Sequence, residues 1–266
     1  MKKFKNHGYI EEERNRPQDH ELGGIASLDY PDIQPDGQWP DFLPSGEQQK
    51  INGVETNSCM SFATLSGLEI LFKKLFDMGV NDSDRYLAIA SDTGPNGNTP
   101  TKVLETLRAV AGCIPENLLP FSEDIQSLEA YMSPNPLNKK YYDEGRKWLA
   151  KYKFNHAWVS TDPASMMAGL KKSPLIISVV AWQEGMGGIY IKPPGIRDNH
   201  ATLLIGYREG KYWLIFDSYP GTDGAYLKRL DWNFGFGMAK AIKITKIKTK
   251  KKWFPRLTKW LSSWFK

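Results

Sequence analysis

The sequence predicts an α+β fold in which a helical lobe is followed by a lobe built from an antiparallel sheet or barrel. Two observations carry this prediction. Apolar residues recur at helical spacing in the first half, whereas the second half contains short apolar runs separated by turn residues. The 266 residues, 41% of them hydrophobic, are enough to bury the core of a single or two-lobed domain. A cleft between two such lobes is the expected place for a binding site.

Residues 1–45 show no sustained apolar periodicity and are rich in Asp, Glu, Pro, Gly and Asn. They predict an extended N-terminal arm that packs on the body through Trp39, Phe42 and Leu43. This arm is expected to wrap the domain, which spans 46–245, and to leave the substrate groove free.

The first strong helix is predicted to begin near Cys59, because Thr56, Asn57 and Ser58 before it are all suitable N-caps. Gly79 stands where a glycine commonly ends a helix. The apolar positions between these two ends share one broad face. They are Phe62, Leu65, Leu68, Leu71, Phe72, Leu75 and Phe76.

A second helix is predicted to start at Pro100 with Thr99 as its cap, because proline suits the first helical position. Further helical stretches are expected around 124–132, 140–151 and 163–172. In the second half, HATLLIGY and KYWLIFDSY are joined by a short Arg-Glu-Gly turn, which predicts a hairpin. The predicted strands are 174–182, 200–207, 211–219, 224–232 and 237–245.

Charge and cysteine content exclude several classes of protein. The net charge is +5, but 243–266 carries nine Lys or Arg and no Asp or Glu, so the body is mildly acidic and no nucleic-acid partner is expected. There is no apolar run of transmembrane length and no signal-peptide core. Two cysteines cannot form a disulfide framework. These features predict a cytoplasmic or particle-associated protein.

Cys59 is the first candidate for chemistry. It stands at the predicted N-terminus of a long helix, where the positive end of the helix dipole favours a thiolate. Cys113 lies in an apolar loop after a helix and is interpreted as a buried structural residue.

His200 and Asp217 are the next two candidates. His200 opens an apolar strand, where a general base can be held rigidly at a cleft rim. Asp217 ends the paired strand and is expected at the same end of the ladder, where a carboxylate would orient the imidazole. His200 follows Cys59 by 141 residues, within the roughly 130–150 residues that separate cysteine and histidine in papain and cathepsin peptidases.

The chain resembles the papain-like cysteine peptidase family over roughly residues 40–245. NSCMSFATLSGLE resembles the family's nucleophile helix, and GPNGNTP resembles its Gly-rich substrate loop. DNHATLLIGYREGKYWLIFDSY is similar to the histidine strand and the strand after it. The resemblance implies a papain-like two-lobed fold. It also implies that Gly97 and Asn98 bind an extended peptide through their backbone.

The sequence departs from the family at three positions of the site. Asp217 stands where the family has asparagine, and Tyr219 stands where it has tryptophan. Gly53 stands where the glutamine of the oxyanion hole is expected, so that role falls to Gln49, or to Asn52 if the loop has an insertion. Gln48 is a further candidate, and Gln49 is preferred.

The resemblance implies a cysteine peptidase that acts on protein or peptide substrates, needs no cofactor and binds no metal. Cys59 would form the acyl-enzyme, His200 would act as acid and base, and Asp217 would hold His200. Two alternatives stay open. One is a weak or inactive papain-fold protein with a structural or delivery role, as in a virus or mobile element. The other is an amidase or transglutaminase-like acyl transferase with a Cys-His-Asp site.

The tail, residues 246–266, combines a basic run with an apolar stripe at helical spacing. A Trp-rich face beside lysines is typical of a helix that lies in a membrane interface or docks on a partner protein. Packing of the stripe on the protein's own sheet and a disordered basic tail are the alternatives. A peripheral membrane location is one version of this prediction. The apolar residues of the tail are Trp253, Leu257, Trp260, Leu261, Trp264 and Phe265.

Overall fold

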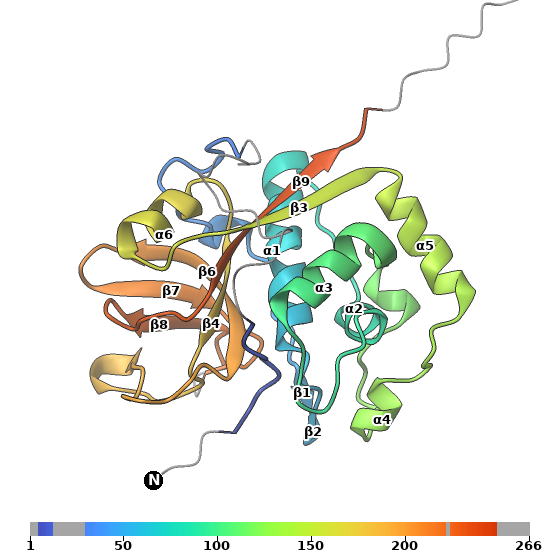
Figure 1. The fold of residues 1–266 in the computed structure, drawn as a ribbon, viewed down its shortest axis with the longest axis horizontal. Coiled ribbons are helices and arrows are strands. Elements are labelled where there is room, and N and C mark those ends of the chain that lie inside the picture. The colour runs from blue at the N-terminus through green and yellow to red at the C-terminus, as the bar shows by residue number, and fades with distance from the viewer. Residues whose placement is uncertain (1–4, 13–29, 222–223, 249–266) are drawn as a thin grey trace, which may run out of the picture.

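A seven-stranded sheet with one long helix packed against it organises the molecule (Figure 1). The structure is a computed structural model that describes residues 5–12, 30–221 and 224–248. The predicted helix of the basic tail lies outside these residues. Among the described helices, none has the length and apolar character needed to cross a membrane.

The helices lie mostly before the strands in the chain, as the α+β prediction requires. The helices are α1 (Cys59–Phe76), α2 (Asp84–Ala90), α3 (Pro100–Thr106), α4 (Leu128–Tyr131), α5 (Lys139–Leu149) and α6 (Pro163–Leu170). The strands are β1 (Lys50–Ile51), β2 (Val54–Glu55), β3 (Tyr152–Trp158), β4 (Leu175–Val179), β5 (Ile189–Tyr190), β6 (His200–Arg208), β7 (Tyr212–Phe216), β8 (Leu227–Asp231) and β9 (Ala239–Lys246).

Helix α1 lies between the two lobes and is buried on almost every side, because β6, β4 and β9 cover one face and α2 and α3 the other (Figure 1). It begins at Cys59 as predicted. The predicted end at Gly79 is wrong. Asp77 adopts the left-handed conformation with φ 51° and its N–H bonds to the carbonyl of Lys73, so the helix ends two residues earlier. Helix α3 begins at Pro100 with Thr99 as its cap, which confirms that prediction.

The sheet has the strand order β3-β9-β4-β6-β7-β8-β5. Its neighbouring strands are antiparallel, as predicted, except β5 and β8, which pair in parallel at one edge. The hairpin β6–β7 forms as predicted. It places the first residue of β6 near the residue that follows β7, and this proximity builds the site described below.

The segment around Trp39 docks on the body, as predicted for the arm. Trp39 is fully buried, and its indole N–H donates to the carbonyl of Leu170 over 2.8 Å. Phe42 and Leu43 pack against the same core cluster while staying partly exposed. Residues 30–45 therefore contribute to the main core.

Replacing Trp39 with alanine should lower the free energy of unfolding by about 3–5 kcal/mol, because a large aromatic residue leaves a cavity and an unpaired carbonyl. Phe42→Ala is the matched control and should cost clearly less, since Phe42 is only half-buried. Urea denaturation of both variants measures the difference. A Trp39→Ala loss below about 1 kcal/mol would contradict the docking of this segment.

Candidate active site

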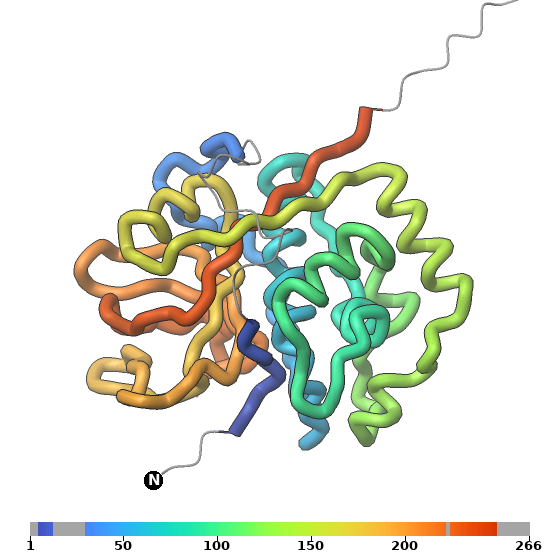
Figure 2. The backbone as a smooth tube through the Cα atoms, viewed as in Figure 1, coloured from blue at the N-terminus to red at the C-terminus, as the bar shows by residue number. Residues whose placement is uncertain are grey.

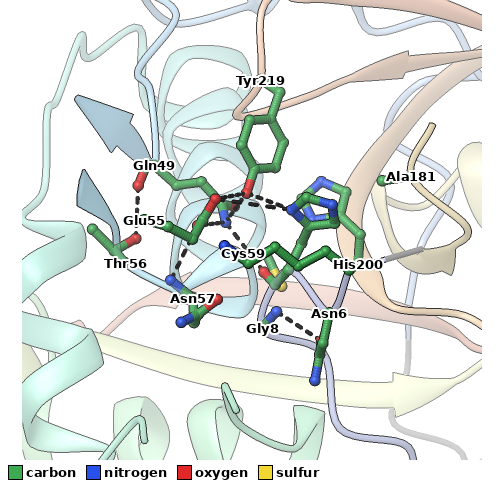
Figure 3. A network of polar contacts seen from close by, with 12 residues as sticks. Asn6, Gly8, Gln49, Glu55, Thr56, Asn57, Cys59, Ala181, His200 and Tyr219 are labelled. Atoms are coloured by element: carbon green, nitrogen blue, oxygen red, sulfur yellow. Dashed lines mark hydrogen bonds and ion pairs between the residues drawn. The ribbon is translucent and has the colours of Figure 1, made fainter. Parts of the chain in front are cut away.

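The sulfur of Cys59 and the ring of His200 meet where the N-terminus of α1 packs against the start of β6 (Figure 3). The backbone N–H of Ala201 donates to Cys59 Sγ over 3.3 Å, so the sulfur lies beside the residue that follows His200. Both side chains are fully buried. Among the described residues, His200 Nδ1 has no hydrogen-bond partner, which leaves this nitrogen available to the thiol.

Asp217 holds the other nitrogen of the imidazole. Its Oδ1 lies 2.7 Å from His200 Nε2, so the two strand-end residues are paired as the hairpin predicted. Burial alone would raise the pKa of Asp217. The adjacent His200 and Lys228 outweigh that effect and hold the pKa below its usual range.

Lys228 is a member of the site that sequence reasoning missed. Its Nζ donates to Asp217 Oδ2 over 2.9 Å, and it also bonds to the carbonyl of Tyr219. Lys228 is 4% exposed on β8, where buried and exposed residues alternate. A lysine at an inward-facing position of an alternating strand was the available signal.

Gln49 reaches the site and Asn52 does not. The Gln49 amide donates from Nε2 to the Tyr219 hydroxyl over 2.7 Å and to Glu55 Oε1 over 2.8 Å, while its Oε1 accepts from the Ser218 hydroxyl (Figure 3). These contacts fix which end of the amide faces the cleft.

The alternative oxyanion residues lie elsewhere, which corrects that part of the prediction. Asn52 occupies the turn between β1 and β2 with φ 50°, and its amide donates to the carbonyl of Glu123. Gln48 and Asn52 line a cavity of about 430 Å³ whose lining includes neither Cys59 nor His200. The backbone of Gln49 is held between Thr56 and Ser218, and this fixes the position from which its side chain reaches Tyr219 and His7.

The expected low pKa of Cys59 is not observed. Burial raises the pKa of the thiol, and the carboxylates of Glu55 and Asp217 raise it further. The N-terminal end of α1 does not compensate for this loss of solvent. Cys113 is likewise buried, with a pKa raised by burial and by Asp82, and it lies apart from the site, as predicted.

Residues 5–12 run between the two lobes and pair with the loop at Asn98, so the prediction that the arm leaves the substrate groove free is wrong (Figure 2). The N–H of His7 donates to the carbonyl of Asn199 over 2.8 Å, and the carbonyl of His7 accepts from Gln49 Nε2 over 3.1 Å. A backbone carbonyl of the arm therefore contacts the amide that was predicted to serve the oxyanion hole.

The loop at Gly97 and Asn98 binds this segment through its backbone. The N–H of Asn98 donates to the carbonyl of Gly8 over 2.9 Å, and the N–H of Ile10 donates to the carbonyl of Asn98 over 3.0 Å. Gly8 has no room for a side chain, because a Cβ there would lie 2.1 Å from the carbonyl oxygen of Asn57. The predicted peptide-binding loop is thus paired with a peptide of its own chain.

Replacing Lys228 with methionine should destabilise the fold by about 3–5 kcal/mol, because Asp217 would keep a buried charge with one partner lost. Adding Asp217→Asn should recover at least half of that loss, since a neutral amide can still accept from His200. Denaturation of the single and double variants at about pH 7 measures the coupling. Purely additive losses would show that the pair is not coupled.

Replacing Glu55 with glutamine should make stability less dependent on pH. Burial would raise the pKa of Glu55, but contacts with His7, Tyr219 and Gln49 outweigh it and hold the pKa at about 2. A depressed carboxyl pKa stabilises the fold above the unfolded value of 4.5, and this stabilisation is lost as the pH falls toward 2.

Glu55→Gln should therefore cost about 1–2 kcal/mol at neutral pH, after allowance for solvent screening. The gap to the wild type should close between about pH 5 and pH 2. Urea midpoints at several pH values measure this. A gap that stays constant with pH would disprove the role of the charge.

The sequence was compared with protein-family models and with curated proteins. No protein-family model matches the sequence. Ananain from Ananas comosus is 22% identical over 226 residues, which cover 80% of this chain and 62% of ananain. Macrodontain-1 from Ananas macrodontes is 21% identical, and the match covers 71% of this chain and 85% of macrodontain-1.

Solved structures match the fold. The bromelain protease from Ananas comosus in complex with the E64 inhibitor has a TM-score of 0.54 and 20% identity, covering 79% of this chain and 96% of bromelain. Digestive procathepsin L 3 of Tenebrio molitor has a TM-score of 0.57 and 14% identity, and the match covers 85% of this chain and 75% of the procathepsin chain. The chain therefore has the fold of the papain-like cysteine proteases and resembles that family in sequence.

Proposed function

We propose that the protein is a cysteine peptidase that hydrolyses peptide bonds through an acyl-enzyme at Cys59. The observation that carries the proposal is the arrangement around one backbone carbonyl. The carbonyl of His7 accepts from Gln49 Nε2, and the ring of His7 lies 6.0 Å, centre to centre, from the ring of His200, which Asp217 holds. The sulfur of Cys59 accepts from the backbone N–H of Ala201, the residue that follows His200. A substrate carbonyl in that place would have a nucleophile, a base and an oxyanion donor within reach.

The reaction follows from these positions. His200 Nδ1 takes the proton of Cys59, and the thiolate adds to the substrate carbonyl carbon. The Gln49 amide and the backbone N–H of Cys59 stabilise the oxyanion. His200 then gives its proton to the leaving amine as the C–N bond breaks, and afterwards takes a proton from the water that releases the acid.

Asp217 would leave one nitrogen of His200, Nδ1, free to react with the thiol. By accepting at Nε2, the carboxylate leaves Nδ1 for the thiol and stabilises the imidazolium that forms during the reaction. Lys228 donates to Oδ2 of Asp217, so the carboxylate contacts the imidazole ring through Oδ1. The positive charge of Lys228 partly neutralises Asp217, so the carboxylate stabilises the imidazolium of His200 less strongly than an unpaired carboxylate would.

The structure shows a closed form, in which segment 5–12 covers the candidate active site. The segment 5–12 lies where a substrate would bind, and Cys59 is 0% exposed. Its thiol is neutral in this environment because burial raises its pKa. We therefore expect activity only after the segment leaves the groove, whether by displacement or by cleavage.

Once segment 5–12 has been displaced or cleaved, Cys59→Ala and His200→Ala should each lower peptide hydrolysis by at least about 10³-fold without unfolding the protein, because they remove the nucleophile and its base. The matched controls Cys113→Ala and His156→Ala should keep activity near the wild-type value. His156 pairs with Glu105 at 2.8 Å, apart from the sulfur.

A thiol-directed epoxide of the E64 type should label Cys59, as read by mass spectrometry, and not Cys113. Label at Cys59 without hydrolysis of any peptide would favour the acyl transferase alternative. No label on the folded protein, even after the segment 5–12 is loosened by substitution, would favour a role without catalysis. Loss of hydrolysis in Cys113→Ala with Cys59→Ala still active would overturn the assignment.

A further inference from the structure

The carboxylate of Glu12 is buried in a site built by two other elements. Its Oε1 accepts from the backbone N–H of Thr101 over 2.9 Å and from the Thr101 hydroxyl over 2.6 Å. Lys240 Nζ lies 3.7 Å from the same oxygen. The side chain of Glu12 is 2% exposed and that of Lys240 is 0% exposed, so these groups meet away from water.

Lys240 is an unusual residue for the interior of a sheet. Its Nζ lies 3.1 Å from the Thr101 hydroxyl and 4.0 Å from the centre of the Trp158 ring. The nearby carboxylate of Glu105 is engaged by His156 and Arg108. A buried ammonium group is costly unless a carboxylate pairs with it, so the pocket favours an anion of this size.

One short segment of the chain links this carboxylate contact to the candidate active site. The same short segment contacts Gln49 through His7, pairs with the backbone of Asn98, and then places Glu12 on Thr101 and Lys240. A peptide that lies along the groove thus reaches from the sulfur of Cys59 to the ammonium of Lys240. The contacts of Lys240 and Thr101 distinguish a charged from a neutral side chain of the peptide. The contacts at Asn98 involve only the backbone and do not depend on the peptide's sequence.

We propose that Lys240 and Thr101 form a carboxylate-binding subsite of the groove, which Glu12 fills in the closed form and which selects an acidic side chain in a bound peptide. The inference names the substrate class of the peptidase proposed above and rests on that function. A neutral side chain of the same shape loses the charge-assisted contacts with the Thr101 N–H, the Thr101 hydroxyl and the Lys240 ammonium, so glutamate should bind about tenfold more tightly than glutamine.

The first test uses the full chain and follows alkylation of Cys59 by iodoacetamide with mass spectrometry. Glu12→Gln should speed alkylation about tenfold, because the segment loses its buried charge contact. Glu11→Gln is the matched control, since Glu11 is exposed and 4.0 Å from the exposed Arg197, and its rate should stay near the wild type. Equal rates for both variants would overturn the proposal.

The second test supplies the segment as a separate peptide. Gly8→Ala should expel the segment, because its Cβ would collide with the carbonyl of Asn57. In that variant, the synthetic peptide KNHGYIEE should protect Cys59 from alkylation at a concentration about tenfold lower than KNHGYIEQ does. Adding Lys240→Met should abolish this preference. Equal protection by both peptides, or a preference that survives Lys240→Met, would overturn the proposal.

A second variant and a separate activity assay complete the test. If Lys240→Met does not fold, Thr101→Val removes the hydroxyl contact and should reduce the preference severalfold. Peptide hydrolysis is measured separately. A preference for glutamate without hydrolysis supports the subsite and rejects the peptidase, whereas hydrolysis without the preference rejects the subsite alone.

Discussion

The packing of the α1 N-terminus against the start of β6 is the contact on which the site depends. It joins Cys59 to His200 across 141 residues and buries both side chains. Burial gives the pair fixed positions, but it also raises the pKa of the thiol and requires a partner for each charge nearby. The hairpin β6–β7 supplies the first such partner, Asp217, because the start of one strand lies beside the end of the other.

The carboxylate at position 217 determines what surrounds it. A neutral amide, as the family resemblance implies for this position, would need no cation, whereas a buried carboxylate does. Lys228 meets that need from β8, and it also bonds to the carbonyl of Tyr219. Tyr219 in turn donates to Glu55 and accepts from Gln49, so the residues that hold the imidazole also orient the oxyanion donor. Replacing one residue of this network therefore changes the electrostatic environment of both His200 and Gln49.

Local patterns predicted the parts of the fold that are determined locally. The start of α3 at Pro100 and the β6–β7 hairpin follow from capping and turn chemistry, and Asp217 followed from its strand end. The path of residues 5–12 could not be predicted, because it depends on backbone groups of Asn98 and Asn199, far along the chain. Lys228 was missed for the same reason, since its burial is explained only by a carboxylate on another strand.

If the proposed function holds, the groups that hold the segment 5–12 are also those that hold a substrate, and the segment and the substrate compete for them. A tethered segment competes at an effective concentration of the order of millimolar, with no loss of translational freedom. Its backbone bonds at Asn98 are each worth only about 0.5–1.5 kcal/mol, so they provide limited discrimination. The buried carboxylate of Glu12 against Lys240 adds a charged contact that a peptide must reproduce. A peptide that lacks an acid at the matching place must therefore displace the tethered segment without gaining a charged contact with Lys240. Selectivity and latency then have the same physical origin in this groove.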